Sequence, residues 1–259
     1  MTYLALEAFE GHGVVGAFST RLGGSSPAPY DTLNLGTSVG DDSARVTGNR
    51  FAFWQAAGVD PDMVVKTDQV HSDRVARVGR QDAGGVAREA DALITCEPGV
   101  VLTAYFADCT PIFYLDPARR AVGLAHAGWR GTVKGIAERV VQRMTEEFGT
   151  APGDLIVAIG PSIGPCCYEV DEDVAVQAER AFPGGGVLSA TRGKWILDLW
   201  RANEAALLRA GVKRNNIVRA GLCTACLSHL FFSHRRDGRR TGRMGAVLSI
   251  AGRGCGTSR

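Results

Sequence analysis

The chain lacks any uncharged apolar segment near the roughly 18 residues that predict a membrane-spanning helix. Its first seven residues also lack the basic stretch and apolar run of a secretory signal. Neither sign of charge dominates, because 29 lysines and arginines nearly balance 27 acidic residues, for a net charge of +2. An overall field this weak gives no reason to expect a nucleic acid or a membrane as a partner.

Several common catalytic and cofactor signatures are also missing. The sequence has no Gly-x-Ser-x-Gly motif and no P-loop, which disfavours a serine hydrolase and a P-loop ATPase. Residues 11–16 match a dinucleotide fingerprint by letter, but a strand pattern follows them where that motif requires a helix. Histidine occurs only five times, which is few for an oxidase with several copper centres.

Cysteine is present but is not arranged as in a secreted, disulfide-stabilised protein. Seven cysteines, an odd number, are scattered over 259 residues, which favours free thiols in a reducing cytoplasm. Cys223 and Cys226 have the spacing of a metal-binding or redox pair, but no second pair with that spacing exists. Cys166 and Cys167 are adjacent instead. We therefore expect a packing or helix-start role for the 223–226 pair.

The hydropathy pattern predicts a single domain over residues 1–259 with a layered α+β fold. Strand-like and helix-like segments alternate without regular βαβ order, which argues against a doubly wound sheet. Pro111 is expected to break a strand, because proline donates no hydrogen bond to a ladder, and Ser43 is expected to cap a helix. Predicted strands cover residues 14–20, 64–65, 75–78, 90–95, 100–106, 112–115, 121–125, 155–159 and 244–250, and predicted helices cover 43–57, 133–148, 171–182 and 197–210.

One cysteine and two histidines lie where predicted strands end. Cys109 interrupts an apolar run, His126 follows another, and His71 lies in a polar break between two strands. Two imidazoles and one thiolate form a zinc ligand set with one position left open, as in catalytic zinc sites. Each residue alone has a plainer interpretation, as a buried histidine, a small apolar cysteine or an exposed loop histidine. Together the three predict a metal centre.

Small and basic residues near these segments indicate anion binding. Free amides at the start of the helix that follows the second histidine, together with Arg130, are one candidate for holding phosphate. Arg21, with Gly23 and Gly24 in a loop of small residues, is another. The basic segment 234–243 fits either a solvated loop or an anion-binding arm.

These segments resemble the YfiH/laccase-domain family, whose members are described as multicopper polyphenol oxidases and as purine nucleoside phosphorylases. The resemblance covers nearly the whole chain. It is carried by Phe-Ser-Thr-Arg-Leu-Gly-Gly-Ser-Ser at residues 18–26, Leu-Asn-Leu at 33–35, Gln-Val-His at 69–71, Ala-Asp-Cys-Thr-Pro at 107–111, His-Ala-Gly-Trp-Arg-Gly at 126–131, Gly-Pro-Ser-Ile-Gly at 160–164 and Phe-Ser-His-Arg-Arg-Asp at 232–237.

The resemblance implies a four-layer α/β/β/α sandwich of mixed sheets with zinc at His71, Cys109 and His126. It implies phosphorolysis of adenosine, inosine, guanosine and methylthioadenosine, and deamination of adenosine. It adds Asn34 and Arg236 to the predicted substrate- or phosphate-binding residues. We expect a monomer or a small homo-oligomer with purine nucleosides and phosphate as ligands.

The chemistry leaves several alternatives open. Zinc-bound hydroxide would need a carboxylate to carry protons, and Asp108 and Glu169 are the candidates. A metal-independent hydrolase in which His126 activates Cys109 as a nucleophile leaves His71 without a role. Copper is the alternative ion, because it binds such ligands more tightly than zinc, and it would fit a polyphenol oxidase. A non-catalytic protein with structural zinc is disfavoured by the missing fourth ligand.

Overall fold

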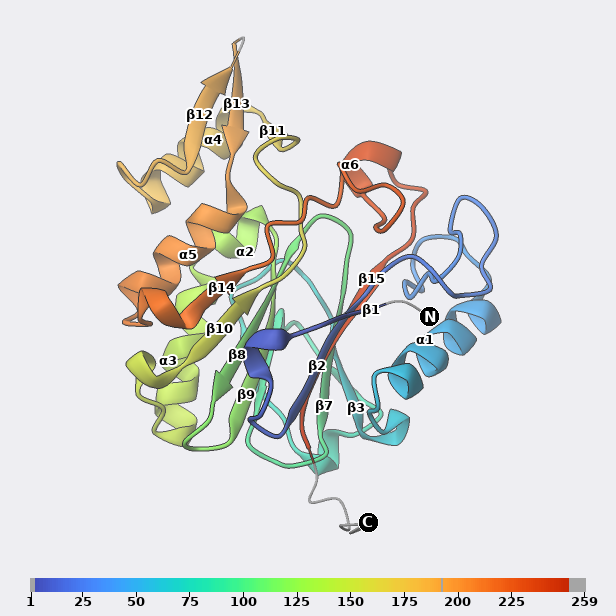
Figure 1. The fold of residues 1–259 in the computed structure, drawn as a ribbon. Helices are drawn as coiled ribbons and strands as arrows, with labels where there is room; N and C mark the ends of the chain where they lie inside the picture. The colour runs from blue at the N-terminus through green and yellow to red at the C-terminus, as the bar shows by residue number, and fades with distance from the viewer. Residues whose placement is uncertain (1–2, 192, 252–259) are drawn as a thin grey trace.

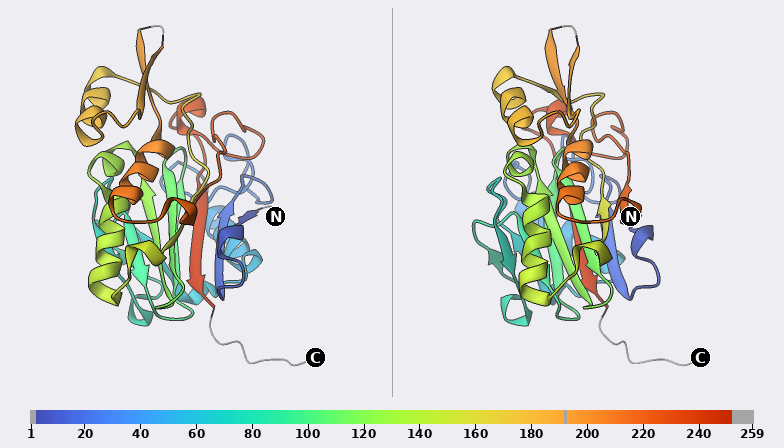
Figure 2. Two further views of the ribbon diagram at one scale, coloured as in Figure 1. Left: turned by 60° about the vertical axis from the view of Figure 1, so that its left-hand side comes forward. Right: turned by 90° about the vertical axis from the view of Figure 1, so that its left-hand side faces the viewer.

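The computed structural model describes residues 3–191 and 193–251. Two six-stranded sheets lie face to face, and helices cover the outer face of each (Figures 1 and 2). In the described part of the chain, no helix combines the length and the apolar composition needed to span a bilayer.

Both large sheets are mixed, with parallel and antiparallel pairs. The first has the order β1 (Tyr3–Ala5), β2 (Val14–Ser19), β15 (Met244–Ile250), β7 (Val101–Phe106), β3 (Val64–Thr67) and β5 (Val86–Ala87). The second has the order β14 (Ile217–Arg219), β10 (Ile156–Ile159), β8 (Thr110–Asp116), β9 (Ala121–Ala127), β6 (Ala92–Thr95) and β4 (Val75–Arg77). A small third sheet has the order β11 (Glu169–Val170), β13 (Lys194–Leu197) and β12 (Leu188–Thr191).

The described residues also form six α-helices and five short 3-10 helices. The α-helices are α1 (Ser43–Ala56), α2 (Trp129–Val133), α3 (Ile136–Phe148), α4 (Glu172–Ala181), α5 (Leu199–Arg209) and α6 (His234–Asp237). The 3-10 helices are η1 (Glu7–Phe9), η2 (Pro61–Met63), η3 (Arg80–Asp82), η4 (Pro152–Asp154) and η5 (Arg214–Asn216).

Three apolar cores separate the layers. The central core lies between the sheets, where Phe106 of the first sheet packs in one cluster with Phe113 of the second. Phe53 of α1 packs in a second cluster on the outer face of the first sheet. Val140 and Met144 of α3 belong to the third cluster, on the outer face of the second sheet. The predicted α+β fold with four α/β/β/α layers is therefore confirmed, and Figure 1 shows it with α1 and α3 on opposite sides.

Two local predictions about how elements begin need correction. Asp42, rather than Ser43, is the N-cap of α1, since its side chain accepts a hydrogen bond of 2.9 Å from the backbone N–H of Arg45. The predicted break in the apolar run is present at residues 107–109, between β7 and β8, but Pro111 itself lies inside β8, opposite His126. It is near the start of that strand, where the missing N–H of a proline is tolerated, and its carbonyl accepts from the N–H of Gly160 at 2.9 Å.

The predicted helix over residues 133–148 is two helices. Gly135, with φ of 85°, separates α2 from α3. The stop predicted at Gly149 is present, because this residue adopts φ of 68° and closes α3 with a left-handed cap. The shorter α2 follows β9 directly, and it therefore begins beside the end of the strand that carries His126.

Candidate metal centre and active site

The three predicted ligands converge at one edge of the gap between the two large sheets. His71 lies on the connection from β3 in the first sheet to β4 in the second, and Cys109 lies on the connection from β7 to β8. His126 is the penultimate residue of β9. Their ligand atoms all lie within 4.8 Å of one another, and Cys109 Sγ lies 4.0 Å from His71 Nε2.

Asp91 forms hydrogen bonds with both histidines. Its Oδ1 lies 2.9 Å from His126 Nδ1 and accepts the backbone N–H of His71 at 3.0 Å. Its Oδ2 accepts the backbone N–H and the hydroxyl of Ser72 at 2.7 and 2.8 Å. Because the carboxylate accepts a hydrogen bond from the Nδ1–H group of His126, the Nε2 atom of that ring is left to bind a metal.

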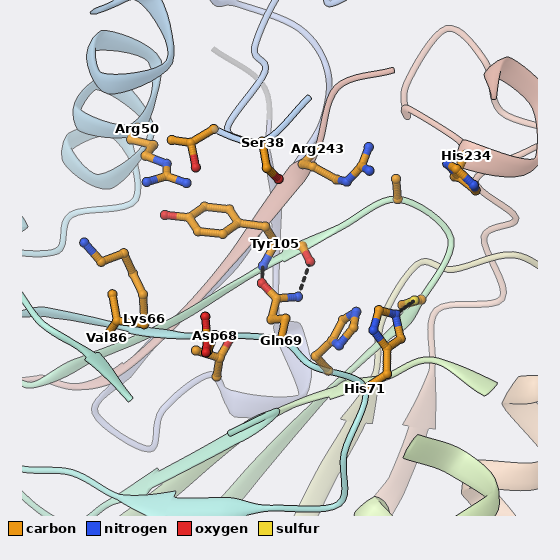
Figure 3. Close-up of a pocket in the computed structure, with 16 residues that line it drawn as sticks. Ser38, Arg50, Lys66, Asp68, Gln69, His71, Val86, Tyr105, His234 and Arg243 are labelled. Atoms are coloured by element: carbon orange, nitrogen blue, oxygen red, sulfur yellow. Dashed lines mark hydrogen bonds between the residues drawn. The ribbon is translucent and has the colours of Figure 1, made fainter. Parts of the chain in front are cut away.

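The backbone that carries the ligands is held in an unusual conformation. His71 and Asp108, the neighbour of Cys109, have φ of 60° and 86°, and Gln69 has φ of 56°. Residues other than glycine adopt such angles infrequently, and they concentrate at functional sites. The side chain of Gln69 fixes this segment by bonding the carbonyl and the N–H of Tyr105 at 2.6 and 2.9 Å (Figure 3).

Gly128 leaves room for the ligands. A Cβ atom at this position would lie 2.9 Å from Cys109 Sγ and 3.0 Å from His71 Cδ2. The backbone φ of −71° is accessible to any residue, so the need for glycine comes from space rather than from conformation.

We expect Gly128→Ala to weaken metal binding by roughly 10- to 100-fold, which is the range seen when groups that position metal ligands are altered. The added methyl group would displace the Cys109 sulfur or the His71 ring. Titration against a competing chelator measures this change. Gly48→Ala in α1 is the control, because no atom lies within 4 Å of its added Cβ. Wild-type metal affinity in Gly128→Ala would show that Gly128 is not needed for space.

The electrostatics favour a thiolate at Cys109. Burial raises the pKa of this thiol, but the positive charge and hydrogen bond of His126, assisted by His71, outweigh it and lower the pKa. Burial lowers the pKa of His126, whereas the Cys109 thiolate and Asp91 outweigh that effect and raise it. A metal ion binds thiolate and neutral imidazole, so binding would release the proton held by this pair.

The donor set fits a borderline divalent ion. One sulfur and two imidazole nitrogens suit zinc and also copper, and three protein ligands leave a position open to solvent or substrate. The orienting carboxylate of Asp91 and the space over Gly128 are what such a site needs around its ligands.

A cavity of about 690 Å³ opens beside the three ligands. Figure 3 shows Arg50, Lys66 and Arg243 directed into it from different elements, with Tyr105 and His234 also in its lining. None of these three cations forms an ion pair with any described residue. Burial lowers the pKa of Arg50, and burial together with the charge of Arg50 lowers the pKa of Lys66. The cavity therefore presents partly desolvated positive charge that suits an anion.

A second cavity of about 330 Å³ adjoins the ligands on the side of α2. Arg130 lines it together with His71 and Cys109, and its guanidinium stacks on the ring of Trp129 at 4.4 Å. Tyr168 lies across the cavity under the guanidinium of Arg235, 5.1 Å from ring centroid to carbon.

The two predicted proton carriers lie in different surroundings. Asp108 is 8% exposed, and its carboxylate oxygens accept from the Thr224 hydroxyl and the Arg235 backbone N–H, both at 2.7 Å. Glu169 is exposed and pairs with Lys194 Nζ at 2.5 Å in a further cavity, whose described lining lacks the three metal ligands. These contacts do not decide whether Asp108 or Glu169 transfers protons, and the role stays a prediction for both residues.

Most of the predicted phosphate-binding residues have structural contacts outside the cavity of Figure 3. Arg21 pairs with Asp31 at 3.1 Å and stacks on Phe232 at 4.6 Å. Gly23 has φ of 95°, and a Cβ on Gly24 would overlap the backbone of Thr32 and Leu33. Asn34 is buried and bonds Asp41 at 2.8 Å, and Arg236 donates to the carbonyls of Thr224, Ala225 and Phe231.

Sequence reasoning missed several residues of the site. Asp91 was detectable as a carboxylate at the start of a buried strand, where an unpaired charge would be costly. Arg50, Lys66 and Arg243 come from α1, β3 and the segment before β15. No local pattern relates them, because only the fold brings them to one cavity. Arg243 belongs to the basic segment 234–243, so part of that segment does face the site.

Four of the other cysteines meet in space, which was not expected from the sequence. Cys166 and Cys167 on one turn meet Cys223 and Cys226 on another, and their four sulfur atoms lie within 4.8 Å of one another. Sequence spacing did not show this, because one of the two pairs consists of adjacent residues.

Residues 15–251 match the family model described as multi-copper polyphenol oxidoreductase laccase. The chain is 42% identical over 248 residues to the purine nucleoside phosphorylase YlmD of Geobacillus stearothermophilus, covering 91% of this chain and 90% of the relative. It is 38% identical over 240 residues to the adenosine deaminase RL5 of an unknown prokaryotic organism, covering 88% and 91%. The crystal structure of Geobacillus stearothermophilus YlmD superposes with a TM-score of 0.93 at 38% identity, covering 97% of each chain.

Proposed function

The chain belongs to the family described as multi-copper polyphenol oxidoreductase laccase, and on that premise we propose that it is a zinc-dependent purine nucleoside phosphorylase. Its substrates would be adenosine, inosine, guanosine and methylthioadenosine with inorganic phosphate. The relatives named as phosphorylases support the reaction class. The observation that carries the proposal is the opening of a cationic cavity directly beside a Cys-His₂ cluster.

The cationic side chains of the cavity are the proposed phosphate-binding groups. Arg50 is held in place by stacking on Tyr105 at 4.1 Å and by donating from Nε to the carbonyl of Leu35 at 2.7 Å. Lys66 and Arg243 line the same space without an ionic partner among the described residues. A phosphate bound here would gain charge-assisted hydrogen bonds and relieve the mutual repulsion of these cations.

In phosphorolysis a phosphate oxygen bonds to C1′ of the ribose while the bond from C1′ to N9 of the purine breaks. The electron pair of that bond leaves with the base, which takes up a proton. Holding phosphate and nucleoside in one cavity makes this bimolecular step effectively unimolecular. His234 lines both cavities, as His71 and Cys109 do, and it is the shared titratable side chain that is not a proposed metal ligand. We propose that it contacts the purine.

A zinc ion bound here would supply Lewis acidity. The chain would hold it through His71, Cys109 and His126, and Asp91 would keep His126 in the tautomer that binds metal. On the side of α2, we propose Arg130 as a further substrate-binding residue because it lines the cavity shared with the ligands. Direct phosphate binding by Arg21, Gly23, Gly24, Asn34 or Arg236 stays a prediction.

Adenosine deamination is the second candidate, and the 38% identity to a protein named adenosine deaminase favours it. The same open site suits activation of water for attack on the purine ring. Asp108 and Glu169 remain the proposed proton carriers for this reaction. A reducing cytoplasm is the proposed compartment, because the six cysteines that the structure describes are free thiols.

Turnover of adenosine by purified protein, with and without phosphate and beside metal analysis, tests the proposal. We expect one zinc at the Cys-His₂ site, and adenine and ribose 1-phosphate formed only when phosphate is present. Adenine release that does not depend on phosphate would contradict phosphorolysis. Full activity in metal-free protein would contradict the zinc requirement and favour a Cys109 nucleophile. If the copper-loaded protein oxidises a phenol and neither metal form cleaves adenosine, the result would favour the polyphenol oxidase.

We expect Lys66→Met to raise the KM for phosphate by roughly 10- to 100-fold, since a hydrogen bond to a charged group contributes about 1.5–3 kcal/mol and about 1.4 kcal/mol corresponds to tenfold. Methionine keeps the apolar stem and removes the charge. Steady-state kinetics at varied phosphate measure the effect. Arg139→Met on the exposed face of α3 is the control. An unchanged phosphate KM in Lys66→Met would remove Lys66 from the phosphate site.

A further inference from the structure

A second cluster of thiols lies away from the Cys-His₂ site. Cys166 and Cys167 lie on the turn that leads to β11, and Cys223 and Cys226 lie on the turn after β14. Cys226 Sγ is 3.4 Å from the sulfurs of both Cys166 and Cys167. The four sulfur atoms all lie within 4.8 Å of one another.

Backbone contacts hold the two turns in register. Ser162 and Cys223 form a parallel bridge, and the N–H of Thr224 donates to the carbonyl of Ser162 at 3.1 Å. The N–H of Gly164 donates to Cys223 Sγ at 3.3 Å. An N–H directed at a cysteine sulfur stabilises negative charge on it, as metal binding by thiolates requires.

The spacing of the sulfurs matches a single tetrahedral ion. With metal–sulfur bonds of about 2.3 Å, a tetrahedral zinc site holds its sulfurs about 3.8 Å apart. The described distances of 3.4 Å lie close to that value and far above a disulfide bond of about 2.0 Å. All six described cysteines are free thiols. A cation bound among the four sulfurs would offset the repulsion that four neighbouring thiolates would otherwise have.

We propose that Cys166, Cys167, Cys223 and Cys226 bind one zinc ion as a second, structural metal site. Four sulfur ligands leave no open position, so this ion would stabilise the fold rather than react. The burial of the cluster is uneven, with Cys223 buried and Cys166 and Cys226 exposed. The exposed pair gives the ion a route from solvent.

The location of the cluster explains what the ion would stabilise. Thr224, between two of the ligands, donates its hydroxyl to Asp108 at 2.7 Å, and Asp108 is the neighbour of Cys109. Tyr168, next to Cys167, lines the cavity at the Cys-His₂ site. A metal bound by both turns would therefore hold in place Asp108 and Tyr168, which both line that cavity.

Metal content of protein purified anaerobically from zinc-supplemented cells, without chelators, tests this site. We expect Cys226→Ser to contain one zinc per chain fewer than the wild type, and Cys166→Ser to show the same loss. Cys96→Ser, a cysteine outside both clusters, is the matched control and should keep the wild-type content. Cys109→Ala should lose a zinc from the other site and keep this one, so the two sites are scored independently.

Two further measurements on the wild type keep the proposal falsifiable if the serine variants misfold. A mercurial that blocks thiols should release this zinc in step with the modification of four cysteines. In the cobalt-substituted protein, charge-transfer bands of a four-thiolate ion should be present in addition to those of the Cys-His₂ site. Equal zinc in Cys226→Ser and wild type would overturn the proposal. A native mass showing a disulfide and no second ion, or iron in place of zinc, would also overturn it.

Discussion

Cys109→Ala is expected to empty the Cys-His₂ site of metal and to lower phosphorolysis by more than about 100-fold. Changing a group that merely orients a ligand costs roughly 10- to 100-fold in metal affinity or activity, so removing the ligand itself should cost more. The substitution also removes the thiolate that His126 and His71 stabilise. Metal analysis and the initial rate of adenine release measure the two effects on the same preparation.

His71→Ala separates the metal mechanism from a cysteine nucleophile. If zinc is required, this variant should lose metal and turnover together, as Cys109→Ala does. If His126 activates Cys109 without a metal, His71→Ala should keep most of its activity, because Cys109 and His126 both remain. Cys96→Ser controls for the general effect of losing a thiol. A Cys109→Ala protein that keeps the full zinc content of the wild type would contradict the ligand assignment.

Asp91→Asn is expected to destabilise the metal-free protein by about 3 kcal/mol, since removing one partner of a buried charged pair costs about 3–5 kcal/mol. Asp91 is fully buried and accepts four hydrogen bonds from His71, Ser72 and His126. An amide would turn two hydrogens toward these donors. Denaturant unfolding measures the loss of stability, and chelator competition should show a roughly 10- to 100-fold weaker metal site.

The effect of Asp91→Asn should depend on pH in a defined direction. Burial raises the pKa of Asp91, but the hydrogen bonds from His126 and Ser72 outweigh it and lower the pKa below 3.8. A carboxyl group with a lowered folded-state pKa stabilises the protein above pH 3.8 and loses that contribution as the pH falls through the folded-state value. The difference between wild type and variant should therefore shrink in acid. Asp62→Asn, at an exposed position of η2, is the control for replacing a carboxylate by an amide.

The predictable part of the fold was the part with local signals. The amphipathic pattern of α3 and the glycine that ends it can be recognised from neighbouring residues alone. The same is true of the apolar runs of β7 and β15. The small strands β1, β5, β11 and β14 were missed, because two or three residues carry too little pattern to stand out. The predicted break in the apolar run is present at residues 107–109, but it ends before Pro111, which pairs with His126 inside β8.

The candidate site likewise has residues that the sequence indicates and residues that only the fold brings together. The three residues of the Cys-His₂ cluster could be singled out from the sequence as candidate metal ligands, since cysteine and histidine beside strand ends have few structural uses and the family resemblance connects them. The cations of the cavity could not, because Arg50, Lys66 and Arg243 are ordinary in their own segments. The thiol cluster shows the same limit, since two turns about 60 residues apart meet only in the folded chain.

His71 and Cys109 lie on the two connections that leave one sheet and enter the other, while His126 is part of the second sheet alone. The ligand set therefore exists only where the two halves of the sandwich are docked, and sliding one sheet along the other would pull the ligands apart. By linkage, an ion bound more tightly by the docked arrangement resists that movement with a free energy that grows with its concentration. The supply of metal to the protein would thus govern the mechanical rigidity of this end of the sandwich as well as its chemistry.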